Sequence, residues 1–112
     1  MSYDERLADR VRPLLPRAKV TEKRMMGGLT FMVDGKMCVG VLGDDLMVRL
    51  DPSVYQEALG WRGARPMDFT KKPMRGFLFV GPEGTKSARD LSHWIATALA
   101  FNPKAKSSRR KP

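Results

Sequence analysis

Residues 27–50 read GGLTFMVDGKMCVGVLGDDLMVRL, three apolar runs separated by two short turn signals. Asp34-Gly35 is among the residue pairs most typical of a two-residue β-hairpin turn, and Gly43-Asp44 is a second glycine-containing pair. The stretch therefore predicts three consecutive antiparallel strands, over 29–33, 36–42 and 45–50.

Two-residue turns would set the register of both hairpins. Val33 is then expected opposite Lys36, Met32 opposite Met37, Thr30 opposite Val39, Val41 opposite Leu46, Val39 opposite Val48 and Met37 opposite Leu50. Because strand neighbours alternate between faces, an almost wholly apolar face is expected to meet the helices. It would comprise Thr30, Met32, Met37, Val39, Val41, Leu46, Val48 and Leu50. The other face would be mixed and open, with Leu29, Phe31, Val33, Lys36, Cys38, Gly40, Met47 and Arg49.

Three helices are predicted from apolar stripes at helical spacing and from residues that favour helix ends. They lie at about 3–12, 52–59 and 88–101, with Ser2, Asp51 and Ser87 as N-caps. Strands are also expected over 21–26, ahead of Gly27-Gly28, and over 76–80, with a short one near 65–69. The order α-β(3-4)-α-β(1-2)-α predicts an α+β two-layer sandwich, an antiparallel sheet with helices on one face. We expect one domain, residues 1–102, and a basic disordered tail, residues 103–112.

The composition favours a folded cytoplasmic protein. The hydrophobic fraction is 42%, and no apolar run approaches the ~20 residues of a membrane span. The charged N-terminus lacks the apolar stretch of a secretory signal. Cys38 is the single cysteine, so no internal disulfide can form.

Few residues suggest catalysis. His93 is the single histidine, and no carboxylates cluster beside it in the sequence. A nucleophile activated by histidine needs a partner within hydrogen-bond reach and a group that orients the base. We therefore expect no catalytic residues, no metal site and no cofactor. A hydrolase or transferase with His93 beside an acid is the enzymatic alternative.

The mixed face suggests a protein-binding surface, because it is too apolar at its centre for a fully solvated one. The candidate interface residues are Phe31, Val33, Cys38, Met47 and Arg49. The expected occupant is a protein partner or a second copy of the chain.

The net charge of +9 favours nucleic-acid binding as the alternative function. Basic residues gather around Trp61 and Phe69 and in the tail. The candidate contacts are Arg62, Arg65, Lys71, Lys72, Arg75, Lys104, Lys106, Arg109, Arg110 and Lys111. Basic side chains interleaved with aromatic ones can hold single strands by charge and stacking.

Several stretches resemble the N-terminal domain of TfoX/Sxy proteins. They are RMMGGLTFMVDGKM at 24–37, LMVRLD at 46–51, RPMDF at 65–69, GFLFV at 76–80, Trp94, and 98–102 in the last helix. The resemblance implies a small α+β fold and a stand-alone domain without the C-terminal domain of full-length members. It implies a role in bacterial regulation of natural competence, with a cyclic-AMP-responsive transcription factor as the partner. It supplies no catalytic residues.

Overall fold

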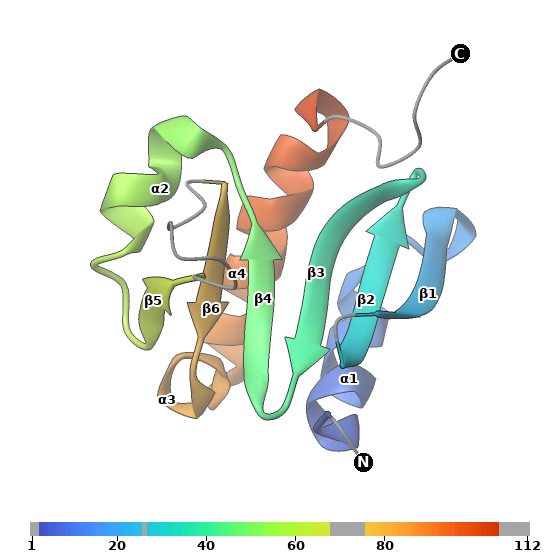
Figure 1. Cartoon of the computed structure of the whole chain (residues 1–112), viewed down its shortest axis with the longest axis horizontal. Coiled ribbons are helices and arrows are strands. Elements are labelled where there is room, and N and C mark those ends of the chain that lie inside the picture. Colours follow the sequence, from blue (N-terminus) through green and yellow to red (C-terminus); the bar gives the residue numbers. More distant parts are fainter. Residues whose placement is uncertain (1–2, 26, 68–75, 106–112) are drawn as a thin grey trace.

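A six-stranded antiparallel sheet forms one layer of the molecule, and the helices form the other (Figure 1). The structure is a computed structural model that describes residues 3–25, 27–67 and 76–105. The strands are β1 (Val20–Met25), β2 (Gly28–Val33), β3 (Lys36–Leu42), β4 (Asp45–Arg49), β5 (Ala64–Pro66) and β6 (Phe77–Val80). Their order across the sheet is β1-β2-β3-β4-β6-β5.

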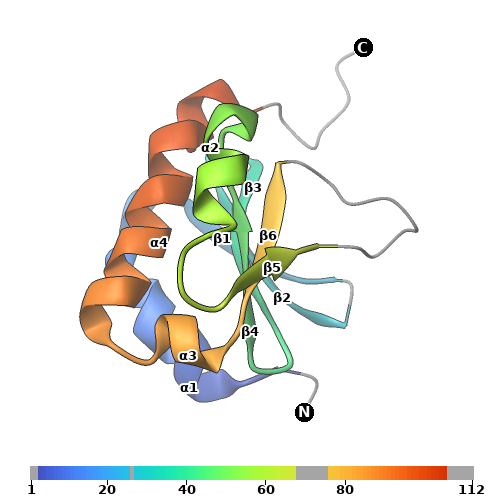
Figure 2. The same ribbon diagram turned by 90° about the vertical axis from the view of Figure 1, so that its left-hand side faces the viewer.

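The helices lie on one side of this sheet (Figure 2), which confirms the predicted α+β class. They are α1 (Glu5–Val11), α2 (Pro52–Ala58), α3 (Pro82–Thr85) and α4 (Ala88–Phe101). Short 3₁₀ turns cover Arg12–Leu14, Arg17–Lys19 and Asn102–Lys104. The main hydrophobic core fills the space between the layers, where Leu46, Val48, Leu78 and Val80 of the sheet join Leu91, Trp94 and Ile95 of α4.

The first hairpin begins as predicted and then changes register. Asp34 and Gly35 both have positive φ, 56° and 76°, as the tight Asp-Gly turn requires. Val33 pairs with Lys36 and Met32 with Met37, but Phe31 then pairs with Val39. The shift leaves Cys38 as an extra residue on β3, which is the geometry of a β-bulge. The predicted pairing of Thr30 with Val39 is therefore wrong, because Thr30 pairs with Gly40.

The bulge exchanges the two faces of β2 relative to the prediction. Leu29, Phe31 and Val33 lie in the core beneath the helices, together with Cys38. Alternation along the strand then places Thr30 on the outer face, the side of the sheet away from the helices. Met32 shares the outer face with Thr30, and Met37 joins an apolar cluster there.

The second hairpin has the predicted register where it is paired. Val41 faces Leu46 and Val39 faces Val48. The ladder ends at Val39, and β3 curves away from β4 beyond it (Figure 1). Met37 therefore does not face Leu50, and that predicted pair is wrong.

Helix ends follow side-chain capping, with one difference from prediction. Asp51 accepts a hydrogen bond from Ser53 N–H (2.9 Å), and Ser87 accepts one from Asp90 N–H (3.0 Å). The N-cap of α1 is Asp4, whereas the predicted cap, Ser2, lies outside the described residues. A carboxylate at this position also interacts favourably with the helix dipole.

Hydrogen bonds join the C-terminal end of α4 to the first hairpin. The Lys36 ammonium donates to the carbonyl groups of Asn102 (3.2 Å) and Pro103 (3.3 Å). The Asn102 side chain donates to the Val33 carbonyl (3.2 Å), and Ala105 is buried. The described structure at this end of the chain continues to Ala105, and the rest of the predicted tail, residues 106–112, lies outside the described residues.

Candidate functional site

The outer face of the sheet carries a second hydrophobic cluster, separate from the main core. Met47, Met67 and Phe79 form its centre and are 0%, 2% and 8% exposed. Met37, Leu42 and Phe77 surround them and remain partly exposed. No helix among the described residues lies over this face (Figure 2). The cluster therefore presents an apolar rim to the outside around a closed centre.

Glycine at position 40 makes room for this cluster. Gly40 pairs with Met47 across β3 and β4. A Cβ at position 40 would lie 3.2 Å from the Met47 methyl group and 3.1 Å from the Leu29 carbonyl oxygen. The missing side chain therefore lets the Met47 methyl group approach the backbone of β3 closely.

Two arginines cover aromatic rings on the outer face. The Arg49 guanidinium lies 5.5 Å from the centre of the Phe77 ring, and that of Arg65 lies 5.2 Å from the Phe79 ring. Arg65 also forms a bidentate pair with Asp45, with N–O distances of 2.6 and 3.2 Å. Burial lowers the pKa of Arg49. Methionine, phenylalanine and arginine together are typical of protein interfaces.

The five predicted interface residues do not share one open surface, and that grouping is wrong. Phe31, Val33 and Cys38 belong to the core beneath the helices. Met47 lies on the outer face but is fully buried, and Arg49 is partly exposed there. Burial raises the pKa of the Cys38 thiol to about 12, so the thiol is neutral at physiological pH. The partly exposed side chains of Met37, Leu42 and Phe77 were not among the predicted residues.

The described basic residues of the nucleic-acid hypothesis lie apart from one another. Arg62 lies beside α4, with its guanidinium 3.9 Å from the Asp90 carboxylate. Arg65 lies on the outer face against Asp45, and Lys104 is exposed in the turn after α4. The other predicted contacts, Lys71, Lys72, Arg75, Lys106, Arg109, Arg110 and Lys111, lie outside the described residues.

An open hollow of about 700 Å³ lies beside His93. It is lined by Arg62, Ser87, Arg89, Asp90 and His93. The His93 ring packs against Trp61, with ring centres 4.5 Å apart. Among the described residues no hydrogen bond joins the imidazole to Asp90 or Ser87, and the Ser87 hydroxyl caps α4. The hollow thus places a histidine near an acid without a formed nucleophile–base pair.

Residues 3–25, 27–67 and 76–105 contain no group of three or more His, Cys, Asp and Glu side chains placed to hold a metal ion. None of the described helices has the length and apolar character needed to cross a membrane.

The fold and the outer face of the sheet define a small α+β domain. Helices cover one face of its sheet, and the other face bears an apolar rim. Residues 12–102 match the model of the TfoX N-terminal domain. The match spans most of the chain, and the chain belongs to that family. No curated protein and no solved structure matches it.

Proposed function

We propose that this chain is a non-catalytic regulatory module that acts in the cytoplasm by binding another protein through the outer face of its sheet. Family membership favours a role in competence-type regulation. The partner class that this role suggests is a transcription factor. The observation that carries the proposal is the Met37, Leu42 and Phe77 rim around a closed apolar centre.

The composition of this face supports binding of a protein. Phe77 pairs with Arg49 across β4 and β6, and Arg65 pairs with Phe79 across β5 and β6. An arginine held over an aromatic ring is already ordered, so less side-chain entropy is lost when a partner binds. Aromatic and arginine side chains are also enriched among residues that dominate binding energy.

Replacing Phe77 with glutamate tests the proposal. The new carboxylate would face Arg49 and should be tolerated by the fold, but it would place a charge in the apolar rim. Capture of partner proteins from a lysate of the source cell, quantified by mass spectrometry, should fall by about tenfold or more. Ala96→Glu introduces the same charge on the exposed side of α4 and should leave capture unchanged. Equal capture by wild-type protein and Phe77→Glu would contradict the proposal.

A second copy of the chain is the alternative occupant of this face. Sedimentation velocity of the wild-type protein and Phe77→Glu distinguishes the two cases. A dimer that Phe77→Glu separates would identify the outer face as a self-association surface. A monomer in both samples, with capture lost only in Phe77→Glu, would identify a different protein as the partner.

A further inference from the structure

Strand β1 forms an open edge of the sheet. Among the described residues it pairs with β2 alone, and it lies at one end of the strand order (Figure 1). Its four central residues, Thr21 to Arg24, are all exposed. An uncovered edge strand offers unpaired backbone groups to any extended chain that can lie beside it.

The ladder between β1 and β2 shows which backbone groups face outward. Asp34 N–H donates to the Lys19 carbonyl (3.0 Å), in line with the pairing of Val20 with Val33. Hydrogen-bonded and non-bonded pairs alternate along an antiparallel ladder. The N–H and C=O groups of Thr21 and Lys23 therefore face β2, and those of Val20, Glu22 and Arg24 point away from the sheet.

A groove of about 500 Å³ runs beside this edge on the helix side. It is lined by Arg12, Pro13, Arg17, Val20 and Glu22. Paired residues of neighbouring strands place their side chains on the same face. A residue added opposite Val20 or Glu22 would therefore point its side chain into this groove.

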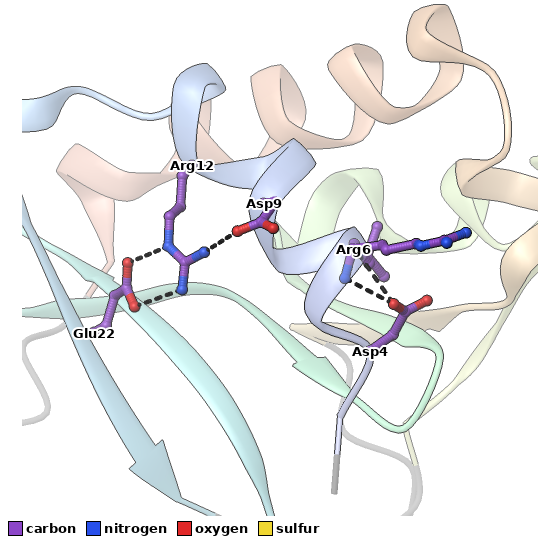
Figure 3. Close-up of polar contacts among 6 residues, drawn as sticks. Asp4, Arg6, Asp9, Arg12 and Glu22 are labelled. Atoms are coloured by element: carbon purple, nitrogen blue, oxygen red, sulfur yellow. Dashed lines mark hydrogen bonds and ion pairs between the residues drawn. The ribbon is translucent and has the colours of Figure 1, made fainter. Parts of the chain in front are cut away.

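The acidic groups near the edge already have partners. The Arg12 guanidinium donates to both carboxylate oxygens of Glu22, at 2.6 and 3.0 Å, and also contacts Asp9 (Figure 3). This contact holds the pKa of Glu22 below its usual range, so the carboxylate stays charged and paired.

Three other cations near the edge are not neutralised in this way by a carboxylate of the described part of the chain. Arg17, Lys23 and Arg24 have no ion pair among the described residues. Lys23 lies on the outer face and Arg24 on the helix side, so positive charge flanks the edge on both sides. An extended segment carrying carboxylates would be attracted to both rows.

We propose that β1 accepts an extended, acidic segment of a partner protein as an added strand, with alternate side chains in the groove between Arg17 and Glu22. The segment binds through its backbone to Val20, Glu22 and Arg24 and through its carboxylates to Arg17, Lys23 and Arg24. This surface is separate from the outer face of the proposed function, and each can be tested without the other.

Pairing of β1 with a second copy of itself is less favourable. In a continuous sheet formed by two symmetry-related β1 strands, residues paired across the interface lie on the same face. Because faces alternate along a strand, the numbers of two paired residues are both odd or both even, and their sum is even. The two central registers then place Glu22 opposite Glu22 or Lys23 opposite Lys23. Like charges directly opposite each other destabilise a strand pair. In the second register Glu22 meets Arg24, but Arg12 already holds both of its carboxylate oxygens.

The test uses a fluorescent probe peptide of about twelve residues that repeats two glutamates and two valines, so that both faces of the extended chain carry carboxylates. This length spans the strand with a margin at each end. Fluorescence anisotropy should show binding to the full chain that weakens as salt is raised. Methylating the backbone nitrogens of alternate probe residues keeps every charge but removes backbone donors along one edge. At least one of the two alternate patterns should weaken binding by about tenfold or more. A probe with lysine in place of glutamate should not bind.

Two variants of Arg24 distinguish the contribution of its side-chain charge to probe binding from that of its backbone N–H. Arg24→Val removes the charge, and Arg24→Pro also removes the outward N–H without breaking a bond to β2. Arg24→Pro should bind the probe more weakly than Arg24→Val. Amide hydrogen exchange gives a second measure: Glu22 and Arg24 should exchange fast in the free protein and slowly with probe bound, while Thr21 and Lys23 stay slow throughout.

The following results would overturn the proposal. In the anisotropy assay they are equal binding of the unmethylated probe and both methylated probes, or no binding at protein concentrations of about 1 mM. In the exchange measurement they are slow exchange of the Glu22 and Arg24 amides caused by self-association without probe, or slow exchange of the same amides caused by single-stranded DNA. Phe77→Glu should bind the probe like the wild-type protein. Loss of probe binding in Phe77→Glu would place the peptide on the outer face and would also overturn the proposal.

Discussion

Replacing Phe31 with alanine is expected to lower the free energy of unfolding by about 3–5 kcal/mol. Phe31 has no exposed surface and lies in the core beneath the helices. Its ring also lies 5.9 Å from the guanidinium of Arg12, in the turn that follows α1. Removing the ring leaves a cavity that the paired strands around it cannot close. Urea denaturation should show a lower midpoint with an unchanged slope.

Phe77→Ala is the matched control. The same side chain is removed, but Phe77 is partly exposed on the outer face. The expected loss is smaller, about 1–2 kcal/mol, because part of the ring already contacts water. Equal losses at the two positions would show that Phe31 does not lie between the sheet and the helices.

A methyl group at Gly84 is expected to cost about 3 kcal/mol of stability, because the backbone around it cannot move aside. A Cβ at position 84 would lie 2.3 Å from the Arg62 carbonyl oxygen and 2.5 Å from a Val80 methyl carbon. The loop that contains Arg62 is fixed nearby, since Gly81 N–H donates to the Gly63 carbonyl (2.9 Å). Thermal unfolding of Gly84→Ala should show a large decrease in Tm.

Gly60→Ala is the control for this substitution. A Cβ at Gly60 would meet only the Glu57 carbonyl oxygen, at 3.4 Å, and Gly60 does not have positive φ. Its effect should be within about 1 kcal/mol and can be stabilising, because alanine restricts the unfolded chain. Similar Tm changes in Gly84→Ala and Gly60→Ala would contradict the close approach at Gly84.

The hairpin turns could be predicted from sequence, but the bulge beside them could not. Asp34-Gly35 predicts the turn and the first two residue pairs of the hairpin beyond it, and the structure confirms both pairs. Every residue of β2 is buried, so the strand lacks the apolar–polar alternation that would distinguish its two faces. Cys38 is small and apolar enough to fit either face, and its neighbours do not mark it as an extra residue.

The arginine–phenylalanine pairs of the outer face depend on contacts between distant segments. Arg49 and Phe77 meet only because β6 adds beside β4. Likewise, Arg65 reaches Phe79 only because β5 returns along the other side of β6. Local patterns carry no information on this strand order, so Arg65 resembled a nucleic-acid contact in the sequence.

The helix ends were more predictable than α3. Asp51 and Ser87 cap α2 and α4 as expected, because capping depends on residues close in sequence. In contrast, Pro82–Thr85 forms a short helix in a stretch rich in glycine and proline that favours a turn. Gly84 fits there because its backbone packs against Arg62, which is a tertiary contact.

Site-specific photo-crosslinking in the source cell tests the proposed binding surface most directly. A benzophenone side chain at position 77 lies in the rim of the outer face, and one at position 96 lies on the exposed side of α4. Binding through the outer face predicts crosslinks to a defined protein, or to a second copy of the chain, from position 77 and none from position 96. Crosslinks of the same protein from both positions, or from position 96 alone, would contradict binding through the outer face of the sheet.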